Sequence, residues 1–319
     1  MAKRFPFTTS SDWFRPKTEE AWHLMRKTDV TATDAAALFG VSPYATPYEL
    51  FHRKAGTFET VFEETERMKW GKRLQFAIAA GICEDRGWKI LSADPFLYVR
   101  SRRFVGMGAS PDYVVFSAEK GVGLLEIKNV DKFIGLDTWN DDEAPAHYEF
   151  QLQHQLECSG LKWGAIGGLI GGNEARVFER DHDEEVGAEI GNRVVDMWRR
   201  VRDNDPYPPD YLKDARTIGR VYLNASPGKV LDAGADPEAA KRVADLAAEY
   251  KAASAREKAA KEDKTRATAE IIDILKDRER LFGVPGVTVS ATTVHLPARV
   301  QEVAETSYRK LSVNIKAPK

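Results

Sequence analysis

Two acidic residues and a lysine within residues 108–128 are the strongest candidates for chemistry in this sequence. Asp112 follows a proline, and Glu126 and Lys128 stand on either side of Ile127. Two apolar, β-branched runs joined by a short polar connection predict a β-hairpin, which would bring Asp112 near Glu126. Side chains alternate along a strand, so Glu126 and Lys128 are predicted to share one face while Ile127 points to the other.

This trio has the groups that phosphodiester hydrolysis needs. Two carboxylates can hold Mg²⁺, which keeps several waters and takes phosphate oxygens as further ligands. The metal lowers the pKa of a bound water and neutralises charge on the phosphate, and Lys128 can orient or deprotonate that water. The alternative is structural: Asp112 begins a turn, and Glu126 with Lys128 forms an ordinary ion pair at a solvated strand end. The triplet alone does not decide between them.

A second candidate site lies upstream, where helix starts are predicted. Thr31 is a predicted N-cap with Asp34 three positions on, and the preceding predicted helix carries Arg26. Helix starts present unpaired N–H groups and a partial positive charge, which suits a phosphate that Arg26 and Thr33 could share. The alternative for Arg26 is an exposed surface cation.

A helix predicted over 146–159 carries several amide side chains. Tyr148, Gln151 and Gln155 fall on one helical face, and buried amides are costly unless they form hydrogen bonds. Their expected partner is a water, a carboxylate or a phosphate. The stretch before this helix, 129–145, is predicted to be a loop near the site.

The order of elements predicts an α/β fold with a mixed central sheet flanked by helices. A cluster of Pro and Gly residues marks a boundary, so we divide the chain into a core over 1–205, a connection over 206–235 and a helical arm with terminal strands over 236–319. The arm is predicted to be one long helix or a helical hairpin, followed by strands over 287–294 and 308–315.

Composition indicates a soluble, cytoplasmic protein without membrane contact. Of the 319 residues 43% are hydrophobic and 30% charged, and no apolar run approaches the ~18 residues of a membrane helix. The first residues lack the apolar core of a signal peptide. Cys83 and Cys158 are too few for a disulfide framework, a zinc knuckle or an iron–sulfur cluster, and are expected to be buried small hydrophobes. With a net charge of −2, any nucleic-acid contact must rest on local basic patches.

Five short motifs occur in an order that is typical of one family. They are Trp22-His23-Leu24-Met25-Arg26, Thr31-Ala32-Thr33-Asp34, Pro111-Asp112, Glu126-Ile127-Lys128 and Tyr148-x-x-Gln151-x-Gln153. In this combination the chain resembles the YqaJ-like viral recombinase family, which includes phage lambda exonuclease and belongs to the PD-(D/E)xK nuclease superfamily. The resemblance spans roughly residues 20 to 200 and implies a nuclease core of that fold.

The resemblance also implies a role for each matching residue. Asp112 and Glu126 match the metal-binding carboxylates, and the main-chain carbonyl of Ile127 matches a further ligand. Lys128 matches the lysine that assists the attacking water. The other matches are the active-site glutamine (Gln151), a family tyrosine (Tyr148), a neighbouring accessory amide (Gln153) and the positions that hold the 5′-phosphate of the DNA strand (Arg26, Thr33).

One position departs from the family pattern. Gln75, on a helix predicted over 68–86, stands where the family usually has a glutamate that serves the metal site. A neutral amide can ligate through its oxygen but supplies no charge, so a second metal would be held less tightly. Either the enzyme tolerates this, or Glu84 contributes instead, or activity is reduced.

The predicted function is that of a Mg²⁺-dependent deoxyribonuclease, with one or two ions and Mn²⁺ as an alternative. The resemblance implies a 5′→3′ exonuclease on double-stranded DNA ends, encoded by a phage or prophage, that leaves 3′ single strands for an annealing protein. A homo-oligomer is a further expectation.

Three alternatives stay open at the level of the sequence. The same site could serve an endonuclease or a single-strand nuclease. Gln75 and the long arm would also suit a non-catalytic protein that binds DNA ends in recombination. The third alternative is a purely structural interaction protein built around the helical arm.

Overall fold

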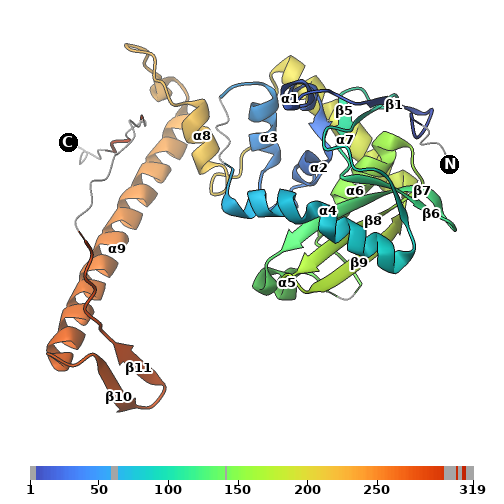
Figure 1. Ribbon diagram of the computed structural model, residues 1–319. Helices are drawn as coiled ribbons and strands as arrows, with labels where there is room; N and C mark the ends of the chain where they lie inside the picture. Colours follow the sequence, from blue (N-terminus) through green and yellow to red (C-terminus); the bar gives the residue numbers. More distant parts are fainter. Residues whose placement is uncertain (1–4, 59–63, 141, 298–306, 308–310, 314–319) are drawn as a thin grey trace. The chain divides into compact units, whose positions relative to one another are not determined.

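The computed structural model describes residues 5–58, 64–140, 142–297, 307 and 311–313 (Figure 1). The chain forms two compact units, Met1–Val221 and Tyr222–Lys319. All predicted site residues belong to the first unit. The division into three segments made from the sequence stays a prediction.

The first unit is built on a five-stranded mixed sheet (Figure 1). Its order is β3-β6-β7-β8-β9, with β7 parallel to β8 and the other neighbouring pairs antiparallel. The strands are β3 (Lys89–Ser92), β6 (Tyr113–Ser117), β7 (Gly121–Val130), β8 (Trp163–Ile170) and β9 (Glu174–Asp181). The predicted hairpin is β6–β7, in which Tyr113 pairs with Leu125. The predicted α/β fold with a mixed sheet between helices is confirmed.

Helices α4 and α6 cover opposite faces of this sheet. The helices of the first unit are α1 (Glu19–Lys27), α2 (Ala32–Leu38), α3 (Pro47–Lys54), α4 (Glu66–Arg86), α5 (Lys132–Thr138), α6 (Ala146–Ser159), α7 (Glu184–Asp203) and α8 (Ala215–Val221). Gly164 and Gly167 of β8 point to opposite faces because their spacing is odd. A Cβ on Gly164 would meet Leu152 of α6, and one on Gly167 would meet Ile82 of α4. Both helices therefore lie close against the strand.

A second sheet has four strands, and its strand β5 ends just before Asp112. Its order is β1-β4-β5-β2, and its strands are β1 (Ser11–Phe14), β2 (Val30–Thr31), β4 (Tyr98–Ser101) and β5 (Met107–Ala109). Val99 of β4 pairs with Ala109 of β5. The short connection between β4 and β5 lets them pair with each other before the chain reaches β6.

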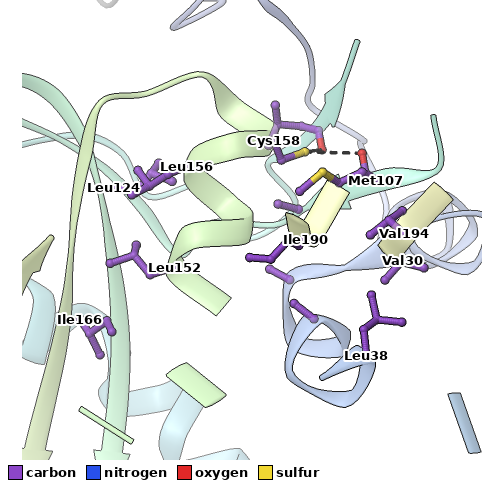
Figure 2. Close-up of a cluster of buried hydrophobic side chains, with 14 of the residues drawn as sticks. Val30, Leu38, Met107, Leu124, Leu152, Leu156, Cys158, Ile166, Ile190 and Val194 are labelled. Atoms are coloured by element: carbon purple, nitrogen blue, oxygen red, sulfur yellow. Dashed lines mark hydrogen bonds between the residues drawn. The ribbon is translucent and has the colours of Figure 1, made fainter. Parts of the chain in front are cut away.

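The main core lies where α6 meets the five-stranded sheet on one side and α2 and α7 on the other (Figure 2). Leu152 and Leu156 of α6 and Ile190 of α7 are fully buried in it. Cys158, also buried, donates a hydrogen bond from Sγ to the carbonyl of Met107 at 3.5 Å. Both cysteines are buried, as expected.

The stretch 129–145 is not the loop that we predicted. Strand β7 continues to Val130, and α5 follows at once, with the Asp131 side chain accepting from the N–H groups of Phe133 and Ile134. This N-cap satisfies donors that would otherwise lack partners, so a short helix forms there. The predicted connection over 206–235 likewise contains α8.

The described residues of the second unit include one long helix and a small hairpin. The helix is α9 (Pro237–Leu275), preceded by a short 3-10 turn, η1 (Ala233–Ala235). The hairpin pairs β10 (Arg280–Val284), which was not predicted, with β11 (Val287–Ser290). The predicted strand over 308–315 lies largely outside the described residues. None of the described helices is long and apolar enough to cross a membrane.

Candidate active site

The β6–β7 hairpin brings Asp112 and Glu126 together. Asp112 stands immediately before β6 and accepts a hydrogen bond from the N–H of Ile127 at 2.9 Å. Glu126 precedes Ile127 in β7 and is only 3% exposed. Ile127 packs on the opposite face of the sheet with apolar residues of α4, so the predicted alternation along β7 is confirmed.

Three donors hold the Glu126 carboxylate. Lys128 Nζ lies 2.6 Å from Oε1, and Gln151 Nε2 donates to the same oxygen at 2.5 Å. Gln155 Nε2 donates to Oε2 at 2.8 Å. The Gln151 carbonyl in turn accepts from Lys128 Nζ at 3.1 Å. A buried carboxylate held on both oxygens is not part of a solvated ion pair at a strand end, which the structural alternative for Glu126 and Lys128 assumed.

The charges of this site shift the pKa values of Asp112 and Lys128. Burial, with the nearby charge of Glu126, raises the pKa of Asp112 to about 7. Burial alone would lower the pKa of Lys128, but the charges of Glu126 and Asp112 outweigh it, so the net pKa lies above its ordinary value. Lys128 is therefore a cation at neutral pH, which suits orienting a water or a phosphate oxygen better than removing a proton.

The donor set fits a divalent cation. Two carboxylates enclosed side by side repel each other, and their mutual repulsion is relieved when a cation binds between them. The residues that would hold it are Asp112 and Glu126, with the main-chain carbonyl of Ile127 as the further predicted ligand. Within the described residues, no group of three or more His, Cys, Asp or Glu side chains is arranged to hold a metal ion. Among the described residues, the metal site formed by Asp112 and Glu126 therefore has two carboxylates and lacks a third.

Gln75, and not Glu84, reaches this carboxylate pair. The Gln75 side chain donates a hydrogen bond to Asp112, which helps to lower the pKa of that carboxyl against the effect of burial. Glu84 lies nine residues further along α4, about 13 Å along the axis, and is exposed. Gln75 therefore lies where a third ligand would be needed and presents a neutral amide there.

The predicted phosphate site is a basic pocket of about 650 Å³. Its lining includes the two predicted residues, Arg26 and Thr33. The guanidinium of Arg26 lies over the ring of Trp22 at 4.4 Å and donates to Ser110 Oγ at 3.1 Å, while Trp22 Nε1 donates to the same oxygen at 2.9 Å. Because Ser110 is two residues before Asp112, this hydroxyl links the pocket to the carboxylate pair.

Asp34 anchors two further cations at the same pocket. Its carboxylate contacts Arg53 Nη2 at 2.6 Å and Lys54 Nζ at 3.0 Å. Burial alone would raise the pKa of Asp34, but the charges of Lys54 and Arg53 outweigh it and hold that pKa well below its usual range. The N–H of Thr31 also donates to Asp34, as the predicted capping box requires. The pocket therefore has several cations and one ionised carboxylate, Asp34, whose charge is offset by Arg53 and Lys54.

The structure brings Tyr148 to the site but not Gln153. Lys128 Nζ lies 4.7 Å from the centre of the Tyr148 ring. Gln153 instead donates to the carbonyl of Asp181 and accepts from the N–H of Asp183, both at 2.9 Å. Two residues along a helix turn the side chain through about 200°, so Gln153 ties α6 to the β9–α7 connection and does not support its predicted accessory role.

Sequence reasoning missed three residues that contact the site. Gln155 was expected to bond to a water, a carboxylate or a phosphate, and the structure identifies the partner as the Glu126 carboxylate. Ser110 adjoins the Pro-Asp motif, which was the available signal. Arg53 and Lys54 gave no local signal, because their contact with Asp34 depends on how α3 packs beside α2.

Part of this chain is similar to a known protein family and to a curated protein. A family model described as a YqaJ-like viral recombinase domain matches residues 21–162. The uncharacterized protein YqaJ of Bacillus subtilis (strain 168) is 26% identical over 181 residues, covering 56% of this chain and 55% of that protein. The chain thus spans about half the length of the curated relative that it matches.

Part of this chain is also similar to solved structures. Two are of LHK-Exo, an alkaline exonuclease from Laribacter hongkongensis, one of them in complex with dAMP. They are 22% and 21% identical to this chain, with 62% of this chain and 98% of each structure covered and a TM-score of 0.48. The family match includes both the basic pocket around Arg26 and the carboxylate pair. Residues 21–162 are therefore similar to the YqaJ-like viral recombinase domain, the family that the order of the motifs predicted.

Proposed function

We propose that this chain is a Mg²⁺-dependent exodeoxyribonuclease that digests double-stranded DNA from 5′ ends and leaves 3′ single strands. The observation that carries the proposal is the Asp112, Glu126 and Lys128 cluster, linked through Ser110 to a basic pocket. The YqaJ-like domain match, which covers both, supports it.

Each described residue has a task in this reaction. A bound Mg²⁺ would act as a Lewis acid on the scissile phosphate and on water. Protonated Lys128 orients the attacking water or a phosphate oxygen, and Gln151 holds Lys128 and Glu126 in register. Arg26 and Thr33 hold the terminal 5′-phosphate, which sets how far from the end the chain is cut.

The proposed reaction also implies which partners the protein has. The substrate is a duplex DNA end, and the 3′ strand that remains would be taken by a single-strand annealing protein. We further propose that the protein acts in the cytoplasm of a bacterium that carries a phage or prophage, and that it assembles as a homo-oligomer. A single-strand nuclease or an endonuclease on the same site would not need the basic pocket, which is why the exonuclease is preferred.

The test is digestion of end-labelled linear duplex DNA, with or without a 5′-phosphate, in Mg²⁺, Mn²⁺ or EDTA. We expect metal-dependent release of nucleotides from phosphorylated 5′ ends, none with Glu126→Ala, and loss of the preference for phosphorylated ends with Arg26→Ala. Covalently closed circular DNA serves as a control substrate. Its cleavage would indicate an endonuclease and contradict the proposal.

A second candidate is a non-catalytic protein that binds DNA ends. Gln75 in place of a third carboxylate favours it, because fewer charges hold the metal. It predicts that the wild-type chain binds duplex ends at low salt without cleaving them in any metal, and that Gln75→Glu cleaves. Cleavage by the wild-type chain would exclude this candidate.

A further inference from the structure

A groove lined by aromatic side chains adjoins the Lys128 side of the carboxylate pair. Its volume is about 980 Å³, at the upper end of the ~300–1,000 Å³ typical of small-ligand sites. Its lining includes Tyr44, Trp139, His147 and Tyr148, which come from the α2–α3 connection, the end of α5 and the first turn of α6. The groove thus joins segments that are far apart in the sequence.

Three neighbouring aromatic rings lead from Lys128 to the surface. The centres of the His147 and Tyr148 rings are 4.0 Å apart, and those of His147 and Tyr44 are 5.8 Å apart. Tyr148 lies beside Lys128, and Tyr44 is 75% exposed at the other end. The His147 and Tyr148 rings are inclined by 49° and the His147 and Tyr44 rings by 85°, so the rings do not form one continuous stack. The exposed ring of Tyr44 is the one that offers a face to a base.

The charges along the groove suit a polyanion. Arg67 and Lys213 line it, and the described residues of its lining include no aspartate or glutamate. Both cations are exposed, so they could contact phosphates on a strand that has a base on the Tyr44 ring. A peptide partner would find aromatic surface here but no acidic group to pair with its own cations.

We propose that this groove binds single-stranded DNA, with a base stacked on the exposed ring of Tyr44 and phosphates near Arg67 and Lys213. The inference rests on the proposed function. Tyr148 lines the groove and lies beside Lys128, so a strand bound in the groove reaches the carboxylate pair.

The test is the affinity of the full chain for an unphosphorylated, 5′-fluorescein-labelled oligothymidylate, measured by fluorescence anisotropy in EDTA. Tyr44→Ala is expected to weaken binding at least about five-fold, because one stacked base contributes ~1–3 kcal/mol. Tyr44→Phe keeps the ring but loses the hydroxyl that bonds to Tyr148, and is expected to bind like the wild type. Tyr211→Ala removes a tyrosine that is 67% exposed outside the groove, and should change nothing.

Three results would overturn the inference: no binding by the wild type at low salt, wild-type affinity in Tyr44→Ala, or equal losses in Tyr44→Phe and Tyr44→Ala. Duplex digestion by the same proteins separates this inference from the proposed function. If the wild type cleaves and Tyr44→Ala binds normally, only the groove assignment fails. If Tyr44→Ala loses affinity while the wild type cleaves nothing in any metal, the groove assignment stands and the nuclease proposal fails.

Discussion

At the scale of single residues, the site depends on how Glu126 is held. Its two oxygens accept from Lys128, Gln151 and Gln155, and the last of these binds Oε2 alone. Gln155 is nearly fully buried, and its own Oε1 has no hydrogen-bond partner within the described structure. Burying an amide whose oxygen lacks a hydrogen-bond partner costs free energy. The contact of Gln155 Nε2 with Glu126 therefore indicates that Gln155 positions this carboxylate.

Gln155→Leu is therefore expected to weaken the response to Mg²⁺. Loss of a residue that orients a metal ligand typically lowers metal affinity by ~10–100-fold. The Mg²⁺ concentration that gives half of the maximal cleavage rate should rise by about that factor. Gln153→Leu is the matched control, since Gln153 bonds only to the backbone of the β9–α7 connection. A similar rise in the control would mean that the effect reflects loss of packing.

His154 is expected to make the stability of the fold sensitive to acid. Burial holds its pKa at about 4, and Nε2 lies 3.0 Å from the carbonyl of Gly108. The unfolded chain takes up this proton near pH 6.5 and the folded chain only near the lower value, so stability is full above ~6.5 and falls below it. The free energy of unfolding should lose about 2 kcal/mol between pH 7.5 and 5 through this residue.

Urea unfolding at both pH values measures this effect. The stability advantage of the wild type over His154→Gln should shrink by that amount at the lower pH. His23→Gln is the control for loss of an imidazole, because His23 is exposed on α1. An advantage over His154→Gln that is equal at both pH values would contradict the assignment.

At the scale of elements, α6 organises the first unit. One face carries Gln151 and Gln155 to Glu126, and the neighbouring face places Leu152 and Leu156 in the core (Figure 2). Gly160 ends the helix in the left-handed conformation at φ 70°. The same helix therefore packs the fold and positions the site, so its displacement would affect both.

Leu152→Ala is expected to lower the free energy of unfolding by about 2–5 kcal/mol. Leu152 has no exposed surface and packs against Gly164 of β8, so its truncation leaves a cavity. Leu24→Ala on α1 is the matched control, since Leu24 is 66% exposed and should cost less than ~0.5 kcal/mol. Equal losses in the two variants, measured by denaturant unfolding, would show that α6 does not support the core.

At the scale of the whole molecule, the candidate site belongs to one unit. The carboxylate pair, the basic pocket and the hydrogen-bond partners found for them all lie within Met1–Val221. The second unit, Tyr222–Lys319, exposes apolar residues along α9, such as Leu246 and Ile271. We therefore expect the first unit to carry out the reaction and the second unit to contribute to assembly.

A chain truncated after Val221 is expected to keep metal-dependent cleavage within a few-fold of the full chain. The measurement is duplex digestion by both chains, with circular dichroism to show that the shorter one is folded. Size-exclusion chromatography with light scattering would report any change in assembly. Loss of cleavage in a folded, truncated chain would mean that the second unit contributes to the reaction.

The sequence by itself determined the features that arise from neighbouring residues. The capping box at Thr31, the β6–β7 hairpin, the bounds of α6 and the meeting of Asp112 with Glu126 were all predicted, because turn chemistry and helical or strand periodicity act over a few residues. The resemblance to the PD-(D/E)xK nuclease superfamily gave each matching residue its predicted role. The periodicity of the sequence could not predict these roles.

Only the tertiary structure decided which distant residues meet. The contacts of Ser110 with Arg26, of Gln155 with Glu126 and of Arg53 with Asp34 join separate elements. Their geometry depends on how helices pack on the sheet, which local patterns do not encode. The pairing of β4 with β5, and the turn of Gln153 away from the site, were missed for the same reason.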